Sequence, residues 1–212
     1  MTQEVLQEVG STRARICAAA FDLFGEKGYD GASMNELAER VGIAKPSLYN
    51  YYRSKEELLL DLVERGIREW GDYCMTPLAR PASFERQLGD HFRLTVDFSS
   101  RHPHMVAVFH MATTHVQGEL AERVQKLVVE METAIQATFA QRIAEAVAAG
   151  ELDPETHIED VLMFLGVFFH GLLFQQTSCP HQVGPLAERL EPVWHLLYRG
   201  VAGRPPREGL RS

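Results

Sequence analysis

The order of apolar and polar residues along the chain predicts a protein built almost entirely from α-helices. Apolar side chains recur every three or four positions through most of the sequence, and no long alternation typical of β-strands stands out. About nine helices are expected. They begin near residues 12, 34, 46, 55, 84, 103, 119, 155 and 186, and the longest ends near residue 149.

Short sequence signals mark where the first helices begin and end. Ser33 and Glu36 form the S-x-x-E pattern of a helix N-terminus, and Ser54 and Glu57 repeat it. Gly42 suits the left-handed conformation that ends a helix. The first three helices are therefore short and closely spaced, whereas the later ones are long.

This contrast in helix length predicts two domains. We assign residues 1–56 to a small N-terminal domain of three helices and residues 57–212 to a larger helical domain. A helix that starts near residue 55 links the two. The expected fold is therefore all-α with two unequal parts.

Two of the short helices have the spacing of a helix-turn-helix. Residues 34–41 and 46–52 are joined by the turn Gly42-Ile43-Ala44. On the second helix, Leu48 and Tyr52 are four positions apart and are expected to face the core. The opposite face then carries Ser47, Asn50 and Tyr51, with Tyr49 at its flank.

The distribution of charge favours a role for this exposed face. The chain has a net charge of -8, which argues against a protein that coats nucleic acid with its whole surface. Between Arg40 and Lys55, however, it holds four basic residues and no acidic one. Tyrosine hydroxyls can donate to phosphate oxygens, and Lys45 can reach a guanine edge or a phosphate. Lys55 lies at a helix N-terminus that also favours a phosphate.

The segment ICAAAFDLFGEKGYDGASMNELAERVGIAKPSLYNYYRSKEELL resembles the DNA-binding domain of the tetracycline-repressor (TetR) family of bacterial regulators. The resemblance covers about residues 12–60, with the motifs AAFDLF, GYDGAS, LAERVG and SLYNYYRSKEEL in the family's order. It implies that the exposed helix reads DNA. The implied DNA-contacting positions are Ser33, Asn35, Lys45, Pro46, Ser47, Tyr49, Tyr51 and Lys55, to which the exposed face adds Asn50.

Two positions depart mildly from the family pattern. Tyr52 stands where phenylalanine is common, and Pro46 stands where glycine or alanine is more usual. The N-terminal extension has little basic character, so no DNA-binding arm is assigned to it.

For the larger domain the resemblance implies a general architecture of ligand binding and dimerisation. Apolar or aromatic effectors are expected, with a candidate pocket formed by Trp70, Phe92, Met105, Phe109, Met131 and Phe168. The last two long helices are expected to form a four-helix bundle with a second copy. Their candidate interface residues are Phe164, Leu165, Phe168, Leu172, Leu190, Val193 and Leu197. For each set, an ordinary place in the protein's own core is the alternative.

Other classes of site receive little support from the sequence. No histidine pair has the three- or four-residue spacing of a helical chelate, and His110 and His115 are expected to point about 140° apart, so no metal site and no cofactor is assigned. The apolar run of residues 161–174 is expected to be too short for a bilayer. Three scattered cysteines and no secretory signal favour the cytoplasm.

The leading hypothesis is a dimeric transcriptional regulator, expected to be a repressor that an effector releases from a palindromic DNA operator. The alternative is a helical protein that binds a small molecule or metal and does not read DNA. An enzyme is the weakest hypothesis, because no nucleophile elbow, phosphate-binding loop, dinucleotide fingerprint or HExxH motif is present.

Overall fold

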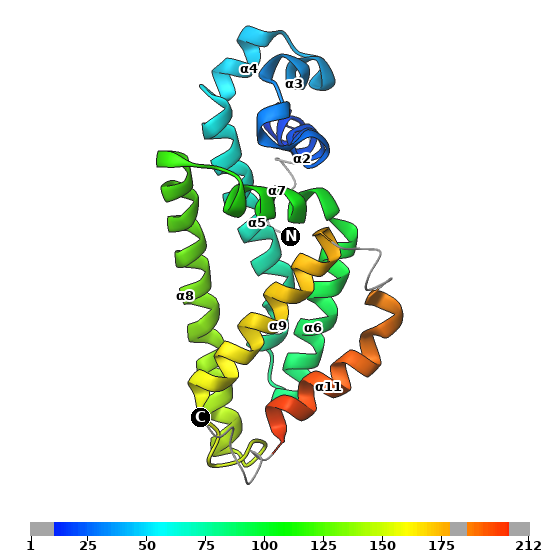
Figure 1. Ribbon diagram of the computed structural model, residues 1–212, viewed down its shortest axis with the longest axis vertical. Helices are drawn as coiled ribbons and strands as arrows, with labels where there is room; N and C mark the ends of the chain where they lie inside the picture. Colours follow the sequence, from blue (N-terminus) through cyan, green and yellow to red (C-terminus); the bar gives the residue numbers. More distant parts are fainter. Residues whose placement is uncertain (1–10, 179–185, 204–212) are drawn as a thin grey trace. The chain divides into compact units, whose positions relative to one another are not determined.

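The computed structural model describes residues 11–178 and 186–203 and confirms an all-α fold with nine α-helices in those residues (Figure 1). The helices follow the predicted order closely. The first group comprises α2 (Thr12–Gly31), α3 (Met34–Val41), α4 (Lys45–Tyr51) and α5 (Lys55–Cys74). After the 3₁₀ helix η1 (Thr76–Ala79) come α6 (Phe84–Arg101), α7 (Pro103–Thr114), α8 (Gly118–Ala148) and α9 (Ile158–Ser178). The 3₁₀ helix η2 (Leu186–Arg189) leads into α11 (Leu190–Ala202).

The chain packs into two compact units, each with its own hydrophobic core. Unit one contains residues up to Trp70 together with Ser99–Met131, and unit two contains Gly71–Phe98 and the residues from Glu132 onward. Helices α5, α6 and α8 each contribute residues to both units. These packing units do not test the predicted division into a domain of residues 1–56 and a domain of residues 57–212. That division stays a prediction.

Local signals explain the helix boundaries in unit one. The Ser11 hydroxyl accepts a hydrogen bond from the Ala14 amide and caps α2. Gly28 interrupts α2 with φ 70° and ψ 178°, a conformation that only glycine adopts without strain. Gly42 ends α3 in the predicted left-handed conformation, with φ 72° and ψ 38°.

The two predicted capping boxes differ in detail. Ser33 and Ser54 accept hydrogen bonds from the amides of Glu36 and Glu57, as expected. The Glu57 carboxylate also accepts from the Arg53 amide at 2.8 Å. The Glu36 carboxylate instead forms ion pairs with two basic side chains, because α2 and α3 bring these charges within 3 Å of it.

Helix α7 packs closely on α2 within unit one, and glycines make this approach possible. A Cβ atom on Gly25 of α2 would lie 2.9 Å from the Cβ atom of His104 on α7. The His104 ring nitrogen Nδ1 lies 2.8 Å from a carboxylate oxygen of Asp22, so a polar contact accompanies the packing. The core of unit one is therefore continuous from α2, α3 and α4 into α7 and the first part of α8.

Unit two has an aromatic core assembled from α6, α8, α9 and α11. The Phe92 ring lies 5.9 Å from Phe168, 6.3 Å from Phe169 and 6.4 Å from Trp194, measured between ring centroids. Trp194 of α11 also packs over Gly89, where a Cβ atom would lie 3.2 Å from its ring. Aliphatic side chains such as Leu88 complete this core.

We predict that Gly25→Ala destabilises the protein by about 1–3 kcal/mol, because the added methyl group forces α7 away from α2. The matched control is Gly71→Ala, in α5, where no atom lies within 4 Å of the new Cβ. That substitution should be neutral or stabilise by about 0.5–1 kcal/mol through helix propensity. Urea unfolding of both variants measures the difference. Equal stability of the two variants would show that the α2–α7 contact tolerates the methyl group.

Candidate nucleic-acid interface

Helix α4 presents one buried face and one exposed face, as its sequence predicts. Leu48 is fully buried, and Tyr52, the residue that ends the helix, is 1% exposed. Pro46 occupies the first turn, where its missing amide hydrogen has no partner to lose. The remaining side chains of the helix therefore face away from the core of unit one.

The exposed face of α4 has the composition of a surface that contacts another molecule. Tyr49 and Tyr51 are 39% and 42% exposed, which is unusual for large aromatic side chains without a partner. Asn50, Lys45 and Pro46 are also exposed, and Ser47 is half-buried. The Lys45 ammonium lies 6.0 Å from the centroid of the Tyr49 ring, at the limit of a cation–π contact. Ser33 and Asn35 at the start of α3 are exposed as well.

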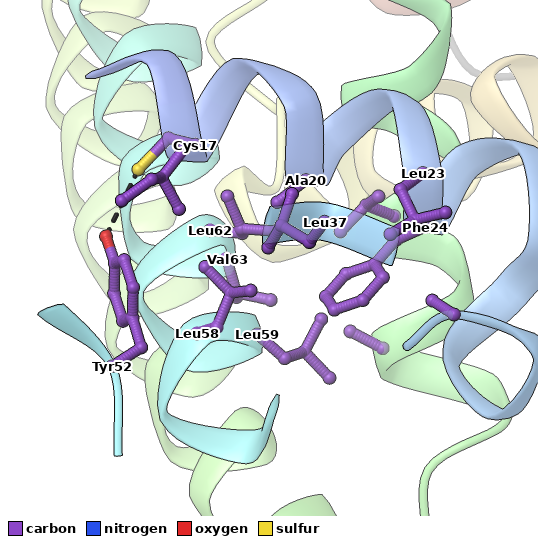
Figure 2. Close-up of a cluster of buried hydrophobic side chains, with 14 of the residues drawn as sticks. Cys17, Ala20, Leu23, Phe24, Leu37, Tyr52, Leu58, Leu59, Leu62 and Val63 are labelled. Atoms are coloured by element: carbon purple, nitrogen blue, oxygen red, sulfur yellow. Dashed lines mark hydrogen bonds between the residues drawn. The ribbon is translucent and has the colours of Figure 1, made fainter. Parts of the chain in front are cut away.

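Tyr52 holds the end of α4 to two neighbouring helices. Its hydroxyl donates to the Asp61 carboxylate on α5 and accepts from the Arg13 guanidinium on α2 at 3.2 Å. The Cys17 thiol of α2 also lies 3.2 Å from this oxygen (Figure 2). Arg65 completes the cluster with an ion pair of 2.9 Å to Asp61. The hydroxyl that phenylalanine would lack therefore fixes the position of the recognition helix.

The electrostatics of this cluster match its geometry. Burial raises the pKa of the Tyr52 hydroxyl, and the hydrogen bond to Asp61 raises it further, so Tyr52 stays a proton donor. Burial alone would raise the pKa of Asp61, but hydrogen bonds from Tyr52 and Arg65 outweigh it and the net pKa is lowered. Asp61 is therefore a charged carboxylate at the centre of the cluster.

The four basic residues between positions 40 and 55 do not contribute equally to the surface. Arg40 forms ion pairs of 2.8 Å and 2.9 Å with Glu26 and Glu36, so its charge is compensated. Lys45 and Arg53 are exposed and form no ion pair with any described residue. These two cations lie at opposite ends of α4 and flank its exposed face.

Lys55 has a structural role that the sequence did not reveal. Its ammonium donates to the carbonyl oxygens of Tyr29 and Ala32 at 2.7 Å and 3.2 Å. It also lies 4.2 Å from the centroid of the Tyr29 ring. Lys55 thereby holds the corner between α2 and α3, and only one of its three N–H groups is left for a phosphate. Phosphate contact by Lys55 stays a prediction.

Arg53 was not predicted from the sequence as a DNA-contacting residue. The signal was present, because Arg53 belongs to the cluster of positive charge and directly follows the helix. The structure was needed to show that the Arg53 side chain is exposed and that its guanidinium forms no ion pair with a described residue.

Comparison with known proteins identifies this arrangement. The sequence model of the family described as "Bacterial regulatory proteins, tetR family" matches residues 16–62, which include α3, α4, Tyr52 and Asp61. The chain belongs to the TetR family of bacterial regulators. The resemblance noted in the sequence is thus confirmed, and the protein is a DNA-binding transcriptional regulator from a family that is not enzymatic.

Relatives of this TetR-family protein match it over most of its length. It is 26% identical over 162 residues to the biofilm operon icaADBC negative regulator IcaR of Staphylococcus epidermidis, covering 76% of this chain and 84% of IcaR. Its fold is similar to Bacillus subtilis FadR solved with stearoyl-CoA, with a TM-score of 0.71, 16% identity and coverage of 91% and 100%. It is also similar to AibR solved with isovaleryl coenzyme A and operator DNA, with a TM-score of 0.69, 18% identity and coverage of 88% and 97%.

The six candidate pocket residues do not line one cavity within either unit. Trp70, Met105, Phe109 and Met131 belong to unit one, whereas Phe92 and Phe168 lie together in the aromatic core of unit two. Sequence spacing could not separate them, because every one of these side chains is large, apolar and helical. Their role in ligand binding stays a prediction.

The candidate dimer residues differ in their exposure within their own unit, and their role in an interface stays a prediction. Leu165 and Leu197 are buried there, at 3% and 2% exposed. Phe164 is exposed, and Phe168, Leu172, Leu190 and Val193 are half-buried. The large apolar side chains that face solvent in α9 and α11 are Met163, Phe164, Val167, Phe174 and Leu196.

The apolar part of helix α9 extends beyond the run of residues 161–174. Residues Ile158–Gln175 have a mean hydropathy of 1.5, so the helix could cross a membrane by length and composition alone, and the expectation that this run is too short was wrong. Only 11% of this window is buried. An apolar surface of this kind requires a partner to cover it.

The histidine geometry differs from the expectation as well. The rings of His110 and His115 lie 6.2 Å apart, and His115 is the residue that ends α7. Within residues 11–178 and 186–203, no group of three His, Cys, Asp or Glu side chains is arranged to hold a metal ion. Cys17 and Cys74 are free and buried, and Cys179 and the N-terminal extension lie outside the described residues.

We predict that Asp61→Asn lowers the free energy of unfolding by about 1–3 kcal/mol at pH 7, since it removes the charge that Arg13 and Arg65 pair with. Because the folded pKa of Asp61 is depressed, its contribution is fully present above the unfolded pKa of about 3.9 and is lost as the pH falls through the folded pKa. The difference between native and variant protein should therefore shrink in strong acid. Urea unfolding across this pH range measures it.

Glu64→Gln is the control for this prediction. Glu64 also pairs with an arginine four residues away, Arg68, but both side chains are more than half exposed. Its replacement should cost less than about 0.5 kcal/mol. If Asp61→Asn costs no more than Glu64→Gln, the Tyr52 cluster does not anchor α4.

Proposed function

We propose that this TetR-family protein is a dimeric repressor that binds a palindromic operator through α4 and leaves it when an effector binds. The observation that carries the proposal is the exposed polar and aromatic face of α4, on a helix whose buried end is anchored by Tyr52. A rigid helix with its polar side chains exposed is the arrangement that reads base edges in a major groove. Residues 1–56 would supply this function, in the cytoplasm where the chromosome lies.

The side chains divide into base-reading and phosphate-binding groups. Ser47, Asn50 and the two tyrosines have the hydroxyl, amide and ring groups that contact base edges, sugars and thymine methyl groups. Lys45 and Arg53 supply uncompensated positive charge at the two ends of α4. Ser33 and Asn35 at the start of α3, together with Pro46 and the remaining N–H of Lys55, complete the proposed surface.

The exposed apolar face of α9 and α11 supports dimerisation. Met163, Val167 and Leu196 are 67%, 71% and 72% exposed, and Phe164 and Phe174 extend the same apolar set. Covering such side chains contributes about 25 cal/mol for each Å² of apolar surface removed from water, against the entropy that association costs. A twofold dimer would place two α4 helices in successive major grooves, about 34–36 Å apart.

The known ligands of similar structures suggest the chemistry of the effector. FadR was solved with stearoyl-CoA and AibR with isovaleryl coenzyme A. The aromatic core of unit two, which contains Phe92 and Phe168, offers a comparable apolar environment. We infer an effector with an apolar or aromatic portion that shifts the dimer toward an arrangement with weaker operator affinity.

The decisive test is selection of sheared bacterial genomic DNA by the purified protein. We expect the native protein to enrich one palindromic sequence and the Tyr49→Ala/Asn50→Ala variant to lose that preference. Arg53→Gln should keep the preference but bind all sequences more weakly. It should also reduce the slope of log K against log salt by about 0.9 for each phosphate that the protein no longer neutralises.

Arg68→Gln is the matched control, because Arg68 is an exposed arginine of α5 already paired with Glu64. It should leave the salt dependence unchanged. Failure of the native protein to enrich any sequence would reject the repressor and favour a helical binding protein that does not read DNA. Enrichment by all variants alike would reject α4 as the reading surface.

We predict that Val167→Glu converts the dimer to a monomer, because a carboxylate on each copy would be buried against apolar side chains. Sedimentation velocity at micromolar concentration measures the change. Val129→Glu is the control, since Val129 is 48% exposed on α8 and lies outside the α9–α11 face. A monomeric native protein, or a dimer that survives Val167→Glu, would contradict this interface. If the native protein is monomeric alone but sediments together with lipid vesicles, the apolar face would be assigned to a membrane.

A further inference from the structure

Helix α6 carries a line of polar side chains on its buried face. Gln87, His91, Thr95 and Ser99 follow each other at intervals of four residues, and they are the buried polar residues among those that the structure describes. Residues four apart share one face of a helix, so this is a continuous polar stripe. Its central members, His91 and Thr95, are 2% and 0% exposed.

Two residues of this stripe have clear structural partners. The Gln87 side chain donates to the carbonyl oxygen of Arg80 at 2.8 Å. His91 Nδ1 lies 2.7 Å from the carbonyl oxygen of Cys74 and must donate to it, because a carbonyl only accepts. Both residues thereby hold the chain between α5 and α6.

Thr95 is different, because its hydroxyl oxygen makes no hydrogen bond of standard geometry. The Cys74 thiol is a polar neighbour and a weak partner at best. A buried hydroxyl without a partner destabilises a folded protein, so each case calls for an explanation. A bound molecule that supplies the missing partner is one such explanation.

The surroundings of Thr95 define the chemistry of such a molecule. Burial lowers the pKa of His91 to about 4, so its ring is neutral at physiological pH. No Asp, Glu, Lys or Arg is among the buried residues that the structure describes. A charged group would therefore enter this core without a counter-ion, which is strongly unfavourable.

The neighbouring aromatic side chains favour a flat or extended apolar ligand. The His91 ring lies 5.2 Å from Phe139 and 5.0 Å from Phe169, both in edge-to-face contact. Phe168 and Phe169 of α9 are half-buried and close one side of this core. Such a ligand would replace ring–ring contacts with contacts of its own.

We propose that Thr95 is the polar contact of the effector, and that the buried part of this effector is a neutral apolar group bearing one hydrogen-bonding oxygen. The inference rests on the proposed function, since it specifies the ligand of the same regulator. The oxygen can be the hydroxyl of a phenol or alcohol, or the carbonyl of an acyl thioester. In either case the Thr95 hydroxyl gains a stronger partner than the Cys74 thiol.

Thr95→Val tests the proposal, because valine keeps the shape of threonine and removes only the hydroxyl. We expect this variant to raise Tm by about 2–4 °C, since an unpaired buried hydroxyl is removed. We also expect it to weaken effector binding by about tenfold. A gain in stability with a loss of binding is the signature of a residue retained for a ligand.

Two pairs of probes identify the oxygen. Titration calorimetry with 4-propylphenol and propylbenzene compares ligands that differ by one hydroxyl, and stearoyl-CoA and isovaleryl-CoA test the thioester. The native protein should prefer a probe with the oxygen, and Thr95→Val should lose that preference. Thr138→Val is the matched control, because the Thr138 hydroxyl already donates to the Ala134 carbonyl at 2.9 Å.

Each outcome decides the proposal. A lower Tm for Thr95→Val would show that the hydroxyl is already satisfied, and equal binding of the probes by native and variant protein would show that no ligand uses it. Failure of the native protein to bind any of the four probes would also overturn it. Operator selection in the absence of ligand is run in parallel. Loss of operator binding by native protein would reject the proposed function, whereas the stability and probe results would still decide the role of Thr95.

Discussion

The hydroxyl group of Tyr52 is the contact on which the DNA-binding part of the molecule depends. It joins the end of α4 to α5 through Asp61 and to α2 through Arg13 and Cys17. A recognition helix of seven residues is too short to be stable alone, so its position must come from tertiary contacts. The cluster combines a buried aromatic ring with a charged network, which constrains both the depth and the rotation of α4.

The basic side chains near α4 have two different roles, because some hold the helices in place and others remain exposed on the surface. Arg40 and Lys55 are used within the protein, one by acidic side chains and the other by carbonyl oxygens. Lys45 and Arg53 are left to attract a polyanion. An acidic chain can therefore bind DNA at one place, because the charge that matters is local and uncompensated.

Unit two contains two features that are unfavourable in an isolated chain. Its aromatic core retains the Thr95 hydroxyl without a hydrogen bond of standard geometry, and α9 leaves Val167 and other large apolar side chains in contact with solvent. Both features lower the stability of an isolated, ligand-free chain. The partners that we propose, a small molecule for the first and a second copy for the second, would explain both features.

The sequence by itself determined the helices, their order and the family. Capping serines, Gly28, Gly42 and the prolines act on neighbouring residues, so their effects can be read locally. The exposed face of α4 was also predictable, because Leu48 and Tyr52 alone occupy its apolar side. Only the tertiary structure decided the role of Lys55, the exposure of Arg53, the assignment of the candidate pocket residues to two different cores, and which side chains of α9 face solvent. Those properties depend on contacts between residues distant in sequence, and a helix that is apolar on every side does not reveal which side its own core will cover.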